Sequence, residues 1–220
     1  MTPWFVSATG TDLGKTYTLC ALLRALREGG ARVGVLKPVL SGFTADDLAA
    51  TDSGRLLAAA GQAVTPETVA RITPWRFVPP LSPDMAAARA GVTIGLGDVT
   101  SFCRQSMVPG VLHFVEGAGG IMSPLGTDFL NIDLVQALEA RVLLVAGGYL
   151  GTISHTLTAL AALDQRGIRP GAVVLSGFQA GPVPLEETQA SILKHTDVPV
   201  FCVARGADVP ASLVAQVRAG

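Results

Sequence analysis

Cysteine and net charge are both scarce in this sequence, and their scarcity excludes several classes of protein. The 220 residues include three cysteines, Cys20, Cys103 and Cys202, which lie far apart and show no C-x-x-C spacing. We therefore expect reduced, buried thiols and neither disulfides nor a zinc site. The 16 Lys and Arg against 17 Asp and Glu give a net charge of -1, and the basic residues are scattered. The sequence thus predicts a small-molecule partner, with no nucleic acid and no membrane surface.

Long apolar runs are also missing from the chain. No uninterrupted apolar stretch reaches the roughly 18 residues of a membrane helix. The segment that begins Met1-Thr2-Pro3 has no basic region typical of a signal peptide, so we expect a cytoplasmic protein. No Ser/Gly linker, charge block or repeat divides the sequence, which predicts one domain over residues 1–220. With 49% hydrophobic residues, 25 glycines and 15% charged residues, the composition is typical of an α/β protein with strands buried on both faces.

The most informative segment that is present lies near the N-terminus. A short apolar strand at Phe5-Val6 leads into a loop that ends in Gly14-Lys15-Thr16, and leucines at helical spacing follow. Such a loop binds phosphate through backbone N–H groups, with the lysine on the terminal phosphates and the threonine hydroxyl on Mg²⁺. The strict G-x-x-x-x-G-K-[ST] pattern fails, because Thr9 stands where the first glycine belongs. The surrounding strand and helix nevertheless favour a phosphate-binding loop (P-loop).

The remaining chain alternates between short apolar runs and helical patterns. Strands are predicted at residues 33–37, 111–115, 142–146, 172–175 and 198–203, and helices near 52–60, 153–166, 185–195 and 211–218. The proline-rich passage 74–83 is predicted to contain neither a strand nor a helix interior. This alternation predicts an α/β fold that is P-loop NTPase-like: a doubly wound, mainly parallel sheet of about seven strands flanked by helices.

Two predicted strands end in charged residues. Lys37 closes one strand and Glu116 closes another, where glycines follow. Ligands of parallel sheets bind beyond the carboxyl ends of strands, so we expect Lys37 to converge with Lys15 and Glu116 to serve as a Mg²⁺ ligand. The alternative is that each is an ordinary strand-end charge in solvent. Three aspartates, Asp46, Asp47 and Asp52, are either metal ligands or helix caps.

Several separated segments together resemble one family, dethiobiotin synthetase. They are Gly10-Thr11-Asp12-Leu13-Gly14-Lys15-Thr16, Lys37-Pro38-Val39-Leu40-Ser41-Gly42, Thr51-Asp52, Pro80-Leu81-Ser82-Pro83, Val115-Glu116-Gly117-Ala118-Gly119-Gly120, Ser123-Pro124-Leu125 and Leu150-Gly151-Thr152-Ile153-Ser154-His155. The P-loop alone is shared with many ATPases, whereas the combination of these segments is specific. The resemblance covers nearly the whole chain.

The resemblance implies a reaction and a set of site residues. 7,8-Diaminononanoate, CO₂ and ATP would give dethiobiotin, ADP and phosphate through an N7-carbamate and a carbamic-phosphoric anhydride. The implied catalytic residues are Lys37, Lys15 and Thr11, and the implied Mg²⁺ ligands are Thr16, Asp52 and Glu116. The implied nucleotide-binding residues are Asp12, Leu13, Gly14, Lys15, Thr16, Tyr17, Glu116, Gly117, Ala118, Gly119, Ser176 and Gly177.

The family also implies a homodimer with active sites near the subunit interface. Substrate-binding residues would then be Thr11, Ser41 and Gly120, together with Leu150, Gly151, Thr152, Ile153 and Ser154 reaching the neighbouring site. A helix N-terminus in that segment would receive the substrate carboxylate.

Some positions depart from the family pattern. The P-loop is two residues shorter than in many members, Asp84 stands where a histidine is common, and Ser154 replaces a common asparagine. Ser176-Gly177 stands where an asparagine often recognises adenine, and neither residue offers an amide that both donates and accepts. We therefore expect relaxed nucleotide selectivity.

Two other functions remain as alternatives at this point. The first is a ParA- or MinD-like ATPase switch, although residues 9–13 lack the extra lysine of those proteins. The second is the synthetase half of a cobyrinate amidotransferase, for which the chain shows no glutaminase with a nucleophilic cysteine.

Overall fold

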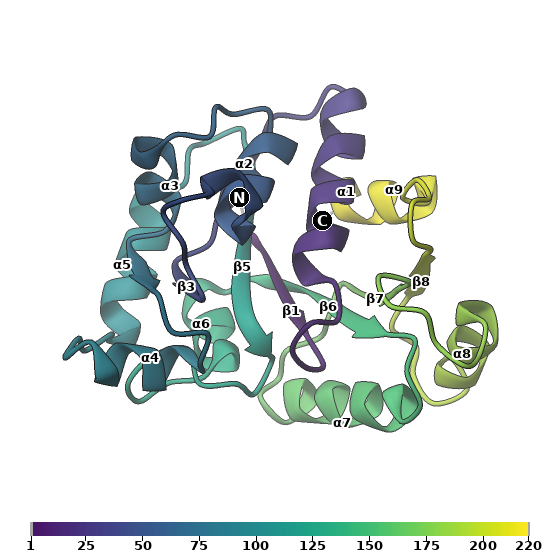
Figure 1. The fold of residues 1–220 in the computed structure, drawn as a ribbon. Helices are drawn as coiled ribbons and strands as arrows, with labels where there is room; N and C mark the ends of the chain where they lie inside the picture. The colour runs from purple at the N-terminus through teal and green to yellow at the C-terminus, as the bar shows by residue number, and fades with distance from the viewer. Residues whose placement is uncertain (1, 220) are drawn as a thin grey trace.

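A six-stranded parallel sheet forms the centre of the molecule in the computed structural model, which describes residues 2–219 (Figure 1). The strand order is β2-β5-β1-β6-β7-β8, and every pairing in it is parallel. The strands are β1 (Trp4–Ala8), β2 (Val33–Leu36), β5 (Leu112–Gly120), β6 (Arg141–Gly147), β7 (Ala172–Ser176) and β8 (Val200–Val203). The predicted doubly wound, mainly parallel architecture is confirmed.

Helices cover both faces of this sheet, as Figure 1 shows with α1 on one side and α7 on the other. Because parallel strands need long crossovers, a helix follows nearly every strand. The long helices are α1 (Lys15–Glu28), α5 (Leu96–Ser106) and α7 (Thr152–Gln165). The shorter ones are α2 (Asp52–Ala59), α3 (Pro66–Ile72), α4 (Pro83–Arg89), α6 (Asn131–Leu138), α8 (Leu185–Ile192) and α9 (Ala211–Ala219).

The core lies between the sheet and these helices. All five residues of β1 and all five of β7 are buried, as the apolar runs predicted. Helix α1 presents Leu19, Leu22, Leu23 and Leu26 to the core, and each is completely buried. The helical spacing of these leucines is the pattern that predicted the helix.

The proline-rich passage 74–83 differs from its prediction. It contains a short strand, β4 (Trp75–Phe77), which pairs in parallel with β3 (Val39–Ser41) to form a second, two-stranded sheet. The three residues of β4 contain no proline, so their N–H groups remain free to pair, and Trp75 N donates to Pro38 O at 3.2 Å. Pro83 then begins α4, a position that needs no N–H donor.

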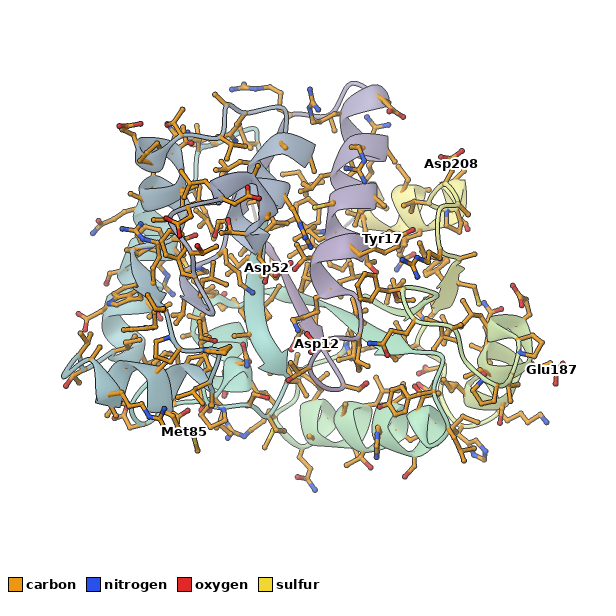
Figure 2. All side chains as sticks on the ribbon, viewed as in Figure 1. Asp12, Tyr17, Asp52, Met85, Glu187 and Asp208 are labelled. Atoms are coloured by element: carbon orange, nitrogen blue, oxygen red, sulfur yellow. The ribbon has the colours of Figure 1, made fainter. Side chains whose placement is uncertain are left out.

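The carboxyl ends of the parallel strands lie at one edge of the sheet and bring together residues that are distant in the sequence. Figure 2 shows Asp12, Tyr17 and Asp52 near the middle of the molecule, and all three line one cleft. Met85 and Glu187 lie at the periphery in the same view. Within residues 2–219, none of the helices combines the length and the apolar character that a membrane crossing requires.

Candidate active site

The P-loop, residues 9–16, connects β1 to α1 through two left-handed residues. Asp12 has φ of 58° and Gly14 has φ of 87°. A side chain at Gly14 would also collide with its surroundings, because a Cβ there would lie 2.6 Å from both Phe178 Cβ and Ser176 Oγ. Gln179 Nε2 donates to Asp12 O at 3.1 Å. The segment after β7 therefore packs directly against the short loop.

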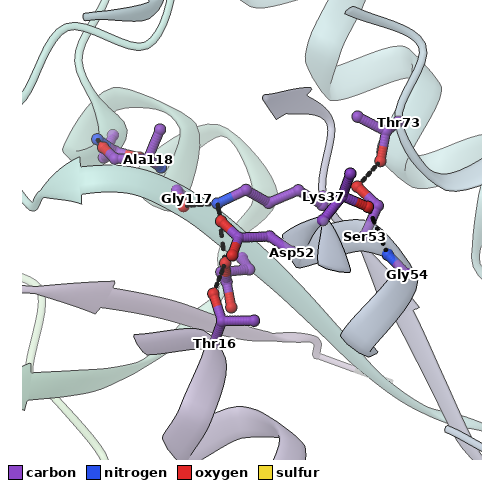
Figure 3. Close-up of polar contacts among 11 residues, drawn as sticks. Thr16, Lys37, Asp52, Ser53, Gly54, Thr73, Gly117 and Ala118 are labelled. Carbon is purple, nitrogen blue, oxygen red and sulfur yellow. Dashed lines mark hydrogen bonds and ion pairs between the residues drawn. The ribbon is translucent and has the colours of Figure 1, made fainter. Parts of the chain in front are cut away.

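A buried ion pair lies beside this loop (Figure 3). Lys37 Nζ donates to Glu116 Oε1 at 2.8 Å and to Gly117 O at 2.7 Å, and it lies 3.7 Å from Asp52 Oδ2. Thr16 Oγ1 donates to the same Glu116 oxygen at 2.9 Å. The strand register explains this contact. Leu36 on β2 pairs with Val115 on β5, and the residues that follow them are Lys37 and Glu116. Lys37 and Lys15 line one cleft, as predicted, whereas the contact of Lys37 with Glu116 was not predicted. Glu116 is fully buried instead of facing solvent.

The two lysines of the site have opposite pKa shifts. Burial alone would lower the pKa of Lys37, but the Glu116 and Asp52 carboxylates outweigh burial and raise that pKa. Burial and the charge of Lys37 lower the pKa of Lys15 to about 8. Among the described residues, Lys15 makes no ion pair within 4.0 Å. Lys37 is thus a permanent cation, whereas Lys15 is a cation that lacks an anionic partner.

The oxygens around Glu116 fit a magnesium ion. Mg²⁺ prefers carboxylate and hydroxyl oxygens. Glu116 Oε2 is buried and has no hydrogen-bond partner among the described residues, and a buried carboxylate oxygen without a partner is costly. Thr16 and Asp52 both line the adjoining cleft. This donor set, with its free buried lone pairs, is compatible with a cation.

The three candidate aspartates now separate by position. Asp52 is the first residue of α2 and lies beside Lys37 in the cleft. Asp47 instead caps a short 3₁₀ helix, accepting from Ala50 N at 3.1 Å. Asp46 is exposed and, like Asp47, does not line the cleft. Of the three, only Asp52 faces the site.

Asn131 is a residue of this site that the sequence analysis missed. Its side chain is fully buried at the start of α6. Asn131 Nδ2 donates to the carbonyls of Ala118 at 2.7 Å, Gly120 at 3.0 Å and Ser123 at 3.0 Å, and its Oδ1 accepts from Ala118 N at 3.2 Å. Gly120 N donates to Ser123 Oγ at 2.8 Å. One amide thus holds the glycine-rich end of β5 against the loop that follows it. The signal in the sequence was an asparagine at the start of a helix, a few residues after a run of glycines.

A cleft of about 890 Å³ is lined by half of the predicted site residues. The predicted site residues that line the cleft are Thr11, Asp12, Gly14, Lys15, Thr16, Tyr17, Lys37, Ser41, Asp52, Ala118 and Gly119. Other predicted residues do not line it, namely Leu13, Glu116, Gly117, Gly120, Ser176 and Gly177. Arg24, Arg55 and Phe178 line the cleft without having been predicted.

The segment Leu150–Ser154 lies outside this cleft. Its five residues line a separate groove of about 860 Å³ beside α7 and α8. Gly151 has φ of 99° and precedes the first residue of α7. The structure of one chain therefore does not bring these predicted substrate residues together with Lys15 and Lys37.

The sequence is similar to known proteins over most of its length. A family model described as an AAA domain matches residues 3–205. An ATP-dependent dethiobiotin synthetase BioD from Methylobacterium nodulans is 46% identical over 217 residues, which cover 96% of each chain. A protein of the same name from Acidiphilium cryptum is 46% identical over 206 residues, covering 91% of this chain and 92% of that protein.

Solved structures resemble the chain in fold. A ParA family ATPase from Chlorobium tepidum has a TM-score of 0.54 at 13% identity, covering 100% of this chain and 90% of that one. A chain of the MinC:MinD cell division complex from Aquifex aeolicus has a TM-score of 0.54 at 11% identity, covering 100% and 86%. At such identities the likeness extends to the fold alone. The full-length relatives carry the classification: this chain belongs to the ATP-dependent dethiobiotin synthetase family.

Proposed function

We propose that this chain carboxylates 7,8-diaminononanoate with CO₂ and closes the ring at the expense of ATP, giving dethiobiotin, ADP and phosphate. The observation that carries the proposal is the buried contact of Lys37 with Glu116 beside a P-loop lysine. A permanent cation at one end of a phosphate cradle suits transfer of a phosphoryl group to a carboxylate-like acceptor. The family's members of the same name support the substrates.

The two lysines would neutralise charge on the phosphoryl group in transfer. Lys37 is held by Glu116 and Gly117 O, so its ammonium is already fixed before substrates arrive. Fixed donors stabilise a transition state without being reorganised during the reaction. Lys15 makes no ion pair within residues 2–219, and bound phosphates would supply the anion that raises its lowered pKa.

Magnesium is the second part of the proposal. Thr16, Asp52 and Glu116 would hold the ion, which supplies charge neutralisation to the phosphates when bound. Glu116 Oε2 and Asp52 supply carboxylate oxygens, and the Thr16 hydroxyl supplies a neutral one. Omitting Mg²⁺ would be expected to abolish turnover in an ATP assay.

The diamine substrate would be held by other residues of the same cleft. Thr11 and Ser41 line the cleft and offer hydroxyls for the carbamate, and the glycine-rich end of β5 exposes backbone there at Ala118 and Gly119. The free N8 amine then attacks the mixed anhydride, phosphate leaves, and the ureido ring closes. Because nucleophile and electrophile belong to one molecule, proximity supplies most of that step.

A homodimer is part of the same proposal. Leu150 is 87% exposed on the loop before α7, and Val183 is 40% exposed on the same groove. Large exposed apolar side chains around a groove are typical of an interface. A second copy covering this groove would let Leu150–Ser154 complete the partner's site, which explains why one chain leaves them apart. Light scattering of the active enzyme should give a dimer mass, and a fully active monomer would contradict this.

Relaxed nucleotide selectivity also stays a proposal. Ser176 is buried, and its hydroxyl accepts from Phe178 N at 3.3 Å. This hydroxyl lacks the paired donor and acceptor of an amide. We expect ATP, CTP and GTP to support turnover at similar rates, whereas a strict adenine preference would contradict the idea.

The deciding experiment supplies purified protein with diaminononanoate, labelled bicarbonate and MgATP. Substrate-dependent phosphate release with label in a cyclic urea supports the synthetase. Hydrolysis of ATP stimulated only by a protein partner would support a ParA- or MinD-like switch instead. Lys37→Ala in the same assay should abolish the labelled product.

A further inference from the structure

Helix α4 begins with a serine whose hydroxyl does not cap it. A serine just before a helix usually accepts a hydrogen bond from a backbone N–H of the first turn. Ser82 occupies this position before α4, and within the described residues its side chain accepts no such bond. Ser82 Oγ instead donates to Asp84 Oδ1, a carboxylate oxygen in the first turn of the same helix. The carboxylate of Asp84, and not the end of the helix, therefore sets the orientation of this hydroxyl.

Ser82 lies on the wall of the cleft that also contains Ser41. The loop before α4 packs on the loop after β3, because Gly42 N donates to Pro79 O at 3.2 Å. Gly42 has φ of 70°, and a Cβ there would lie 3.4 Å from Pro80 Cβ, so a glycine lets the two loops approach closely. The two serines thus come from adjoining loops and line one cleft.

The contact with Asp84 determines what Ser82 can bind. A serine hydroxyl has one proton, and Ser82 donates it to Asp84, so its oxygen offers only lone pairs to a ligand. A carbamate or phosphate oxygen without a proton is also an acceptor and finds no donor here. An amine N–H is a donor and fits, and the negative charge of Asp84 strengthens such a bond when the amine is cationic. Thr11 and Ser41, by contrast, must donate to the carbamate oxygens in the proposed function.

The substrate of the proposed function has an amine that needs an acceptor. 7,8-Diaminononanoate forms its carbamate at N7, and N8 stays free until the ring closes. An alkylamine has a pKa near the ordinary value of lysine, about 10, so N8 arrives as a cation. Lys15 and Lys37 line the reacting part of the cleft and repel that charge. We propose that Ser82, oriented by Asp84, binds the N8 amine, an inference that rests on the proposed function.

This contact would decide which of the two amines is carboxylated. With N8 held at Ser82 Oγ, N7 is the amine directed toward Thr11 and Ser41, where the carbamate forms. Ser82 Oγ can accept an N–H from the charged amine and from the neutral amine, so N8 stays in place when it attacks the anhydride. Asp84 acts through Ser82 and is a positioning residue. Because the family commonly has a histidine at this position, the negative charge of Asp84 is a departure of this chain from the family pattern.

The test uses 7-aminononanoate, which keeps N7 and the carboxylate of the substrate but lacks N8. KM for the diamine is measured from the labelled cyclic urea, and the inhibition constant of 7-aminononanoate is measured in the same assay. In Ser82→Ala, KM for the diamine should rise by about tenfold, as expected when one hydrogen bond to a charged group is lost. Asp84→Asn still accepts from Ser82 but lacks the negative charge, so the rise should be smaller. In both variants the inhibition constant of 7-aminononanoate and KM for ATP should not change.

Asp98→Asn is the matched control. Asp98 also lies in the first turn of a helix, α5, and none of the described residues of α5 lines the cleft. This substitution removes a carboxylate near a helix N-terminus, as Asp84→Asn does, without altering an acceptor of the cleft. KM for the diamine and the inhibition constant of 7-aminononanoate should both stay unchanged.

Three results would overturn the inference. KM for the diamine could stay unchanged in Ser82→Ala, it could rise together with the inhibition constant of 7-aminononanoate, or it could rise as much in Asp98→Asn as in Asp84→Asn. The first would mean that Ser82 does not contact the amine, the second that it supports the shape of the cleft, and the third that any helix-terminal carboxylate has this effect. Each leaves the synthetase reaction standing as long as the unchanged protein forms the labelled cyclic urea, whereas absence of that product would refute the proposed function itself.

Discussion

Two regions border one cleft but are built in opposite ways. They are the β5 end, which is residues 116–123 with Lys37 and Asn131, and the P-loop, residues 9–16. At the β5 end, Lys37 and Asn131 are buried with several hydrogen bonds each. In the P-loop, Lys15 makes no ion pair within 4.0 Å in the part of the chain that the structure describes, and Asp12 holds a left-handed backbone. One region is stabilised by its polar contacts, and the other costs stability until a ligand binds. A binding loop with unsatisfied charge is prepared for phosphate.

Removing the cation of the β5 end should have the largest effect. Lys37→Met leaves Glu116 buried without its partner, and breaking a buried pair in this way costs about 3–5 kcal/mol of unfolding free energy. Urea denaturation measures the loss, and turnover should fall to background. The double variant Lys37→Met with Glu116→Gln should recover stability without recovering turnover. If Lys37→Met alone is as stable as the unchanged protein, the polar contacts do not stabilise this region.

Truncating the amide of the same region should have the next largest effect. Asn131→Ala removes four hydrogen bonds and leaves unsatisfied carbonyls, at an expected cost of about 2–4 kcal/mol. The glycine-rich end of β5 would also lose its support, so KM for the diamine should rise more than KM for ATP. Asn131→Asp, which retains the size but cannot donate, tests whether the three donated bonds matter. Equal KM values in all three proteins would make Asn131 a residue of stability alone.

Removing the positive charge of Lys15 in the P-loop should raise the stability of the protein instead of lowering it. At pH 7, Lys15→Met should raise the unfolding free energy by about 1–3 kcal/mol, because the lowered pKa measures a cost of keeping the ammonium protonated. Turnover should be lost at the same time. Thermal unfolding at pH 7 measures the gain, and Arg169→Met, on an exposed ion pair, is the control. A lower melting temperature for Lys15→Met would contradict the contrast between the regions.

The pH dependence of that gain sharpens the comparison. The pKa of Lys15 is about 8 when folded, against an ordinary value of 10.5. Between these values the unfolded chain retains a proton that the folded protein has released, so stability rises with pH. The gain in unfolding free energy from Lys15→Met should therefore be complete below pH 8 and disappear as the pH approaches 10.5. Denaturation midpoints of both proteins at pH 7, 8 and 9 would show the difference shrinking, and a constant difference would contradict it.

The smallest effect should come from the strained backbone of the P-loop. Asp12 has φ of 58°, which a β-branched side chain adopts with difficulty. Asp12→Val should lower stability by about 1–2 kcal/mol, whereas Asp12→Gly should leave stability unchanged or slightly raised. Urea midpoints distinguish the two variants. Equal midpoints would show that the left-handed conformation carries no cost.

The sequence predicted the elements whose signal is local. The leucines of α1 and the apolar runs of β1, β6 and β7 have clear periodicity, and these elements form as predicted. The short strand β4 was missed because three residues between prolines carry no periodic signal. Helices α3 to α6 were likewise not predicted, although Thr65 and the proline after it mark the start of α3.

The site shows the same division. Thr16, Lys37 and Glu116, whose side chains meet in the structure, could be named from the sequence because they belong to motifs at strand ends. Asn131 and Phe178 were missed, because an isolated asparagine or phenylalanine gives no pattern from which its neighbours can be inferred. Their contacts join residues that are distant along the chain.

The sequence by itself determined the family, the P-loop and the alternation along the chain of those strands and helices that carry a clear pattern, because motifs and hydrophobic periodicity are local properties of the chain. Only the tertiary structure decided which charges meet. Lys37 contacts Glu116 across 79 positions because β2 and β5 are neighbours in register. Phe178 faces Arg205 because Gly177 allows backbone contact between the loops that follow β7 and β8. Such pairings depend on strand order and crossover geometry, which no local pattern contains.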